Sequence, residues 1–138
     1  MEINRFIEAQ RSWIGVAQSE LKSGKKTSHW IWFIFPQVVG LGKSLTSDYY
    51  GLSSLEEARE YYANRYLRRN LIKCLHIVYR YKNISTVKEC LGELDTTKLH
   101  SCVTLFYIAT NKKFFKQILD KFFNGLIDRQ TVILLEKR

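Results

Sequence analysis

The spacing of apolar residues is the feature that most limits how this chain can fold. In residues 4–21 the large apolar side chains recur every three or four positions, from Phe6 through Trp13 to Leu21, which is the period of one helix face. Similar stretches cover most of the remaining chain, and no alternating strand pattern with a hairpin turn is present. Residues 30–35 are apolar throughout and fit either a short strand or a helical turn. We therefore predict an all-α fold, a single domain over residues 1–138 with about six to eight packed helices.

Capping residues indicate where the first predicted helices begin and end. Asn4 is expected to be the N-cap of the first helix, and Gly24 is expected to close it in a left-handed conformation. Ser54 and Glu57 form a capping box, which predicts a helix that runs to Tyr62. Between these two helices, residues 39–53 are rich in Gly and Ser and are predicted to be a loop.

The second half of the chain carries similar signals. Asp95 is expected to be the N-cap of a helix over residues 96–109, and Asp128 the N-cap of a last short helix. The other helices predicted from apolar spacing and from closing glycines cover residues 69–81, 85–91 and 114–122.

Composition and charge narrow the class of protein. Hydrophobic residues make up 46% of the 138 residues and aromatic residues 14%, which is enough for a packed core. No apolar run approaches the roughly 20 residues of a membrane span, and the first ten residues lack the pattern of a signal peptide. We expect a cytoplasmic protein without a membrane partner. Its net charge of +9 favours anionic partners, either a small anionic or nucleotide-like ligand or a nucleic acid. The alternative is that these charges are solvated helix surfaces.

Cysteine and histidine do not suggest a metal or cofactor. Cys74, Cys90 and Cys102 are odd in number and none belongs to a CxxC pair, so we expect reduced, partly buried thiols. The three histidines are too far apart in sequence to supply close ligand spacing. We predict no metal and no cofactor, and the sequence does not indicate an oligomeric state.

Residues 25–37, KKTSHWIWFIFPQ, combine aromatic, cationic and amide side chains and are predicted to form part of a binding pocket. Trp30 and Trp32 could stack on a ring of a ligand, or pack in the core. His29 could act as a general acid or base, or hold a loop carbonyl. Gln37 could bind a ligand edge with its amide, or bond its own loop.

The same segment carries a resemblance to a known family. Its pattern, G-x-K-x-S-H-W-x-W-F-x-F-P-Q followed by G-L-G-x-S, stands here at Gly24 to Ser44, and further blocks stand at Asp95–Phe106 and Gly125–Thr131. This pattern resembles the uncharacterised, mainly bacterial domain-of-unknown-function family DUF1810. The resemblance implies an all-α fold and no established activity. This chain departs from the family pattern at residues 64–71, where three arginines stand in a stretch that usually contains proline and glycine.

The resemblance also directs attention to the second block. Lys26 and Lys98 become the favoured cations for an anionic ligand; a lysine could also act as a nucleophile if burial lowers its pKa. Asp95 and Asp128 are expected to be caps unless they reach a pocket. Ser101 and Thr104 lie three residues apart and could line the same cleft.

From these residues we draw a leading hypothesis and an alternative. The leading hypothesis is an enzyme or binder for a nucleotide-like ligand such as an ADP-ribose derivative; by analogy in size and composition to the all-α NADAR-type N-glycosidases, the enzyme would be a hydrolase. The alternative is a non-catalytic basic binding module for nucleic acid or protein, suggested by Arg65, Arg68 and Arg69. The expected catalytic residues are His29, Lys98 and Asp95. The expected ligand-binding residues are Lys26, Trp30, Trp32, Gln37, Ser44, Ser101, Thr104 and Asp128.

Overall fold

The structure, a computed structural model, describes residues 3–137 and confirms the all-α prediction. In that range the chain forms nine helices: α1 Asn4–Ser23, α2 Ile31–Ile34, α3 Leu45–Tyr50, α4 Leu55–Ala63, α5 Arg65–Tyr79, α6 Ile84–Leu91, α7 Glu93–Thr110, α8 Lys113–Phe122 and α9 Arg129–Glu136. The predicted number of six to eight was too low. The difference comes from two short helices, because α3 lies inside the predicted loop and residues 30–35 form a helical turn and not a strand.

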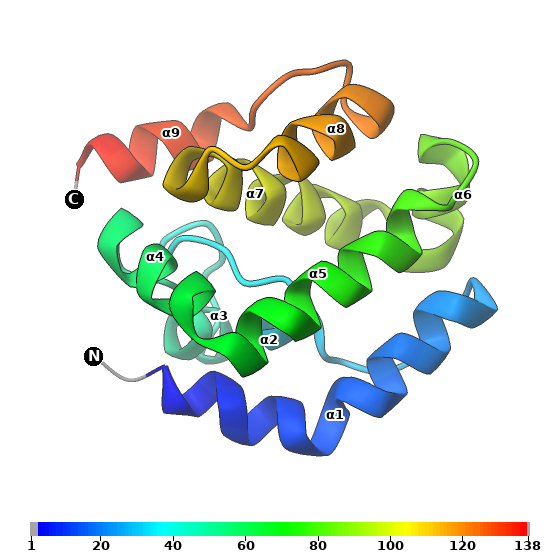
Figure 1. Cartoon of the computed structure of the whole chain (residues 1–138), viewed down its shortest axis with the longest axis horizontal. Coiled ribbons are helices and arrows are strands. Elements are labelled where there is room, and N and C mark those ends of the chain that lie inside the picture. Colours follow the sequence, from blue (N-terminus) through cyan, green and yellow to red (C-terminus); the bar gives the residue numbers. More distant parts are fainter. Residues whose placement is uncertain (1–2, 138) are drawn as a thin grey trace.

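The helices surround one hydrophobic core. In Figure 1, α1 lies on one side of the molecule and α8 with α9 on the opposite side, while α5 and α7 pass between them. α1 packs on α5, and α7 packs on α4, α8 and α9. From Ser101 to Phe106 every residue of α7 is buried, as expected for a helix with neighbours on all sides. α7 is therefore the fixed element against which other segments can be positioned.

The helix ends show which capping predictions hold. Gly24 closes α1 with φ 86°, and the Ser54 hydroxyl accepts the backbone N–H of Glu57 at the start of α4, both as predicted. The Asn4 prediction was wrong, since Asn4 already lies inside α1 and Ile3 precedes it without a side-chain cap. α5 begins at Arg65, four residues earlier than predicted, because the Asn64 side chain accepts the N–H of Leu67.

Asp95 is not an N-cap. α7 begins at Glu93 after Gly92, which has φ 86°, so Asp95 lies in the first helical turn. Its carboxylate makes ion pairs with two lysines. Asp128 is the N-cap of α9, as predicted, and accepts the backbone N–H of Thr131.

The loop before α4 is held at its base. Val38 and Leu52 form an isolated parallel bridge, with N···O distances of 2.8 Å from Val39 to Leu52 and from Leu52 to Gln37. The Arg5 guanidinium donates to the carbonyls of Tyr49 and Gly51. Arg5 also lies 3.3 Å from the Glu57 carboxylate in a buried ion pair. These contacts fix residues 38–52 as a closed loop. In the described residues no helix is both long and apolar enough to cross a membrane.

Candidate functional site

A cleft of about 470 Å³ lies between the closed loop, α7 and the first turn of α9. This volume is within the range of small-molecule sites, roughly 300–1,000 Å³. Its lining comes from three parts of the chain that are far apart in sequence: Trp32, Gln37, Leu41, Gly42, Lys43, Ser44 and Ser47 from α2 and the loop, Leu94, Thr97, Lys98 and Ser101 from α7, and Asp128 and Gln130 at α9. The cleft brings together six of the residues predicted from the sequence, namely Trp32, Gln37, Ser44, Lys98, Ser101 and Asp128.

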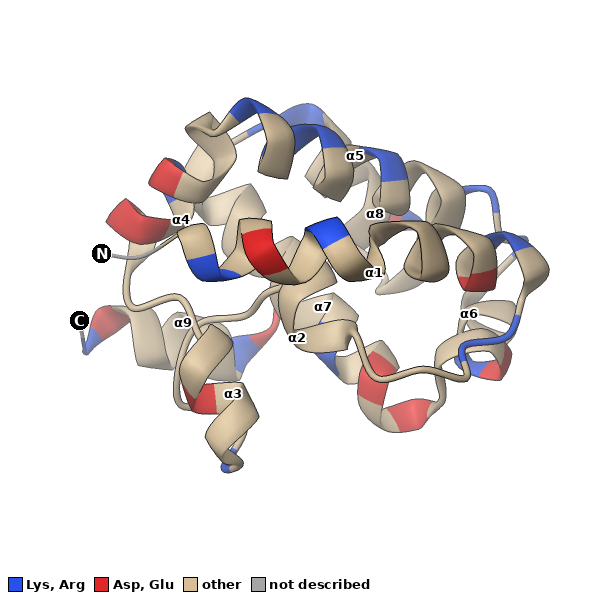
Figure 2. Ribbon diagram, turned by 90° about the horizontal axis from the view of Figure 1, so that it is seen from below, with Lys and Arg blue, Asp and Glu red and all other residues tan. Residues whose placement is uncertain are grey.

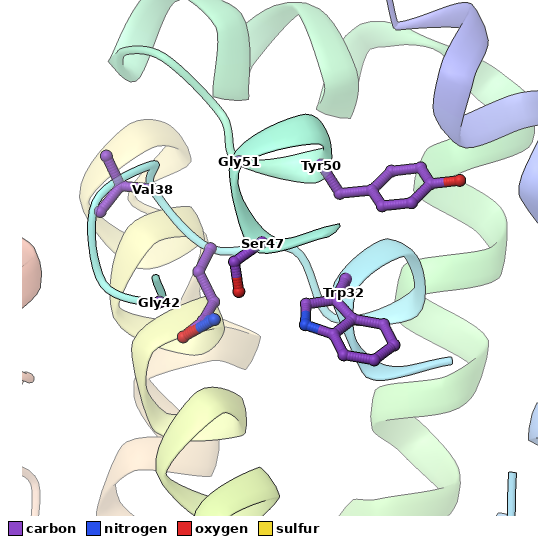
Figure 3. A pocket seen from close by; sticks show the side chains of 7 residues that line it. Trp32, Val38, Gly42, Ser47, Tyr50 and Gly51 are labelled. Carbon is purple, nitrogen blue, oxygen red and sulfur yellow. The ribbon is translucent and has the colours of Figure 1, made fainter. Parts of the chain in front are cut away.

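The loop side of the cleft continues into a small recess of about 10 Å³. Figure 3 shows the Trp32 indole on α2 and the Tyr50 ring on α3 at one side of this recess, with Ser47 and Gly42 at the other. A Cβ atom added to Gly42 would lie 2.1 Å from the Ser47 hydroxyl oxygen. The absence of a side chain at Gly42 therefore lets the loop fold closely onto Ser47 and form this wall.

The basic end of the cleft is formed by Lys98. Its ammonium nitrogen lies 5.2 Å from the centroid of the Trp32 ring and 3.6 Å from Oδ1 of Asp95. The Lys98 side chain is 16% exposed. A partly exposed cation above an indole, beside an open cleft, can bind an anionic group and an aromatic group of one ligand.

Lys26 is connected to Lys98 through Asp95, which pairs with both lysines. Lys26 does not line the cleft, and its side chain is only 8% exposed. Its ammonium lies 2.8 Å from Oδ2 of Asp95 and 5.0 Å from the centroid of the Trp30 ring. Asp95 therefore bridges two lysines, each placed against a tryptophan. It contacts Lys26 more closely than Lys98, so it holds Lys98 in place without fully neutralising it.

Asp128, at the start of α9, is the acidic residue of the cleft lining. Its Oδ2 atom accepts the Thr131 backbone N–H, the Thr131 hydroxyl and the Ser101 hydroxyl. The backbone N–H of Asp128 donates to the hydroxyl of Thr104 over 2.9 Å. Ser101 and Thr104 therefore act together in fixing Asp128. Thr104 is fully buried and does not itself line the cleft.

The first residues of the aromatic segment are held by Glu20 of α1. Its carboxylate accepts the backbone N–H groups and hydroxyls of Thr27 and Ser28 and the indole N–H of Trp30. Burial acts to raise the pKa of Glu20. The hydrogen bonds from Ser28, Trp30 and Thr27 lower the pKa by more than burial raises it, so that it is about 2. A charged carboxylate thus positions the segment that leads into Trp32, a role of Glu20 that no sequence pattern indicated.

Five of the eleven predicted site residues do not line the cleft: Lys26, Asp95 and Thr104, whose contacts are described above, and Trp30 and His29. The Trp30 ring is fully buried and packs edge-on against Phe35, with 6.1 Å between ring centroids, so it belongs to the core. His29 is exposed and does not line the cleft. Their predicted roles gain no support from this arrangement.

The sequence reasoning missed other lining residues. Thr97 and Leu94 lie one helical turn from Ser101 and Lys98, so helical spacing could have found them once those two were chosen. Gln130 follows Asp128 at the start of α9 and also lines the cleft. No sequence signal separated it from an ordinary surface residue.

The cysteines offer no exposed reactive thiol. Cys74, Cys90 and Cys102 are free and buried. Burial raises the pKa of Cys74 to about 12, and it raises the pKa of Cys90 and of Cys102, which keeps these thiols protonated. Among the described residues, no group of three or more His, Cys, Asp or Glu side chains could hold a metal ion.

Comparison with known proteins places this fold in an uncharacterised group. The model of a family described as "Protein of unknown function (DUF1810)" matches residues 1–135. The crystal structure of the conserved hypothetical protein Rv1873 from Mycobacterium tuberculosis is similar, with 40% sequence identity and a TM-score of 0.91. That similarity covers 96% of this chain and 95% of the other. A search of curated proteins gives no match.

Proposed function

This chain belongs to the family of proteins of unknown function DUF1810, and we propose that its cleft binds a small anionic, nucleotide-like ligand such as an ADP-ribose derivative. The observation that carries the proposal is the placement of Lys98 above the Trp32 ring at one end of the cleft. A nucleotide presents phosphate and an aromatic base, and these two groups are what a cation and an indole bind.

Lys98 is the cation best placed to meet a phosphate. Among the described residues Lys43 and Lys98 are the lysines that line the cleft, and Lys43 is on its exposed loop. The 3.6 Å separation of Lys98 from Asp95 is longer than a normal hydrogen bond. A phosphate can therefore approach Lys98 and make a shorter, charge-assisted contact without breaking the tighter pair between Asp95 and Lys26.

Trp32 and Gln37 supply the remaining recognition. Trp32 is partly exposed and lines both the cleft and its recess. The amide of Gln37, which lines the same two spaces, offers both a donor and an acceptor to the edge of a base. Binding of a phosphate by Lys98 and of a base by Trp32 and Gln37 would use two neighbouring walls of the cleft.

A hydrolytic version of this function would use the same basic end. An N-glycosidase-like reaction on an ADP-ribosyl or nucleotide compound needs groups that reach the ligand. Lys98 lines the cleft and Asp95 pairs with it, whereas His29 does not line the cleft. Incubation with ADP-ribose and NAD, followed by mass spectrometry, measures turnover directly. Product formation that disappears in Lys98→Ala would extend the proposal from binding to catalysis.

The binding proposal is tested by isothermal titration with ADP-ribose at low salt. We expect Lys98→Ala to weaken binding by about tenfold or more, the effect expected when a hydrogen bond to a charged group is lost. Lys113→Ala is the matched control, because Lys113 is exposed on α8 and does not line the cleft. Equal affinities for the wild type and Lys98→Ala, with unchanged thermal melting, would refute the proposed role of the cleft.

The basic surface of α5 supports a second candidate function, the binding of nucleic acid. Figure 2 shows Lys and Arg residues along α5. The predicted arginine cluster divides in the structure, because Arg68 donates to the carbonyls of Tyr62 and Ala63, whereas Arg65 and Arg69 are exposed. Binding to a short RNA or DNA that falls steeply with salt and is lost in the double variant Arg65→Ala with Arg69→Ala would favour this candidate.

A further inference from the structure

The cleft lining carries opposite charges on two of its walls, so a ligand with a charged group is expected to bind in one orientation. Lys98 on α7 and Asp128 at the start of α9 line the same space. A phosphate is attracted to Lys98 and repelled by Asp128. The group placed at Asp128 must therefore be a hydrogen-bond donor without negative charge.

The contacts of Asp128 leave one of its oxygens available. In the part of the chain that the structure describes, all three side-chain contacts of Asp128 go to Oδ2, from the Thr131 N–H, the Thr131 hydroxyl and the Ser101 hydroxyl. Capping α9 thus occupies Oδ2 and not Oδ1. The network that holds Asp128 also prevents it from turning freely, since its backbone N–H is bound by the buried Thr104.

We propose that Asp128 is a specificity-determining residue that accepts hydrogen bonds from sugar hydroxyls of the ligand through Oδ1. This inference rests on the proposed function, and it narrows the ligand from nucleotide-like anions in general to compounds that carry a phosphate and a hydroxylated sugar. Ribose phosphates have this chemistry, whereas inorganic phosphate and pyrophosphate do not.

The placement of Lys98 and Asp128 suits such a compound. Lys98 and Ser101 are three residues apart on α7, which is ~4.5 Å along the helix axis. The Lys98 ammonium extends toward Asp95, which precedes it on the helix, and Ser101 contacts Asp128. The phosphate and hydroxyl sites therefore lie at different levels along α7, as a ligand that carries both groups requires.

The inference is tested with Asp128→Asn in the full chain. Asn is also a favourable N-cap, so its amide oxygen keeps the cap of α9 while its NH₂ group replaces the free acceptor by a donor. Asp120→Asn is the matched control for the loss of a charge, because Asp120 is exposed on α8 and pairs with Lys116. Overlay of the amide NMR spectra of each variant with the wild type shows whether the fold is kept.

The probes are ribose 5-phosphate, 2-deoxyribose 5-phosphate and inorganic phosphate, each titrated into ¹⁵N-labelled protein. We expect the wild type to prefer ribose 5-phosphate over the deoxy compound by about three- to tenfold, the value of one hydrogen bond. Asp128→Asn should remove this preference and leave the affinity for inorganic phosphate unchanged or higher. Asp120→Asn should behave as the wild type.

The outcomes separate this inference from the function on which it rests. An unchanged preference in Asp128→Asn would overturn the role of Asp128, while the proposed function stands if phosphate binding still depends on Lys98. A wild type that does not distinguish ribose from deoxyribose would also overturn the inference. If none of the three probes shifts residues of the cleft and ADP-ribose does not bind either, the proposed function fails as well.

Discussion

The ammonium group of Lys98 lies 5.2 Å from the centroid of the Trp32 ring. Trp32 comes from the aromatic segment near the start of the chain, whereas Lys98 is on α7. This pair joins two of the sequence segments that line the cleft. A ligand that binds at Lys98 should therefore change the environment of the Trp32 indole.

We expect Trp32→Phe to weaken the binding of ADP-ribose by about three- to tenfold, since a phenyl ring is a weaker stacking surface and cation partner than an indole. The wild type should show a change in tryptophan fluorescence on titration, and Trp32→Phe should not. Trp13→Phe is the control, because Trp13 is exposed on α1 outside the cleft. Loss of the signal in the Trp13 variant instead would place the ligand elsewhere.

Asp95 should contribute to stability as well as to the position of Lys98. We expect Asp95→Asn to lower the free energy of unfolding by about 1–3 kcal/mol, because Lys26 is almost fully buried and would lose its charged partner. Asp120→Asn, which removes an exposed ion pair with Lys116, should change stability by less than about 1 kcal/mol. Urea denaturation at neutral pH measures both, and equal effects would show that the Asp95–Lys26 pair has no special weight.

Because the pKa of Glu20 is lowered in the folded chain, we expect the stability of the protein to depend on pH. This pKa is about 2 in the folded chain against an ordinary value of 4.5, so the stability that Glu20 contributes is complete above about pH 4.5 and is lost as the pH falls toward 2. Glu20→Gln should destabilise the protein by about 1 kcal/mol at pH 7, a modest value because the carboxylate is partly solvated.

The Glu20 prediction is checked by urea denaturation of the wild type and Glu20→Gln between pH 7 and pH 3. The gap between the two proteins should narrow as the pH falls. Glu8→Gln, a change at an exposed position of the same helix, controls for general acid effects. A gap that stays constant over this range would show that the hydrogen bonds to Glu20 do not favour its charged form.

Gly51 is required where the closed loop returns to its base. A Cβ atom at this position would lie 2.7 Å from the Cα of Val39, so Gly51→Ala must push the two backbone segments apart. We expect a loss of about 1–3 kcal/mol. Gly15→Ala is the opposite case, since a Cβ there meets no atom within 4 Å and should stabilise the exposed middle of α1 by roughly 0.5–1 kcal/mol. Thermal melting distinguishes the two signs, and a neutral Gly51→Ala would contradict the close approach.

The sequence predicted the helices well and the cleft in part. Apolar spacing and caps such as Gly24 and Asp128 act over a few residues, so their consequences can be read locally. The α3 helix was missed because Gly and Ser surround it and it has no buried residue. Asp95 was predicted to be an N-cap because Asp is common at that position of a helix. Only the fold shows that Asp95 forms an ion pair with Lys26, which is far from it in sequence.

The candidate site shows the same difference between local sequence signals and contacts that only the fold creates. Lys98, Ser101 and Asp128, which the resemblance tied to the aromatic segment, line the same cleft as Trp32. Trp30 and Trp32 are two residues apart, and in the structure packing buries the Trp30 indole completely and leaves Trp32 partly exposed. The anchoring of the segment by Glu20 depends on the turn that returns the chain to α1, and no local pattern reports that turn.

We propose the cleft between the closed loop and α7 as the place where this protein binds its ligand. This proposal is tested most directly by titrating ADP-ribose into ¹⁵N-labelled protein and following the amide and indole signals. We expect the largest shifts at the indole N–H of Trp32 and at the backbone of Gly42 and Ser101, and we expect them to vanish in Lys98→Ala. Shifts confined to Arg65 and Arg69 of α5, or no shift at millimolar ligand, would contradict the proposal.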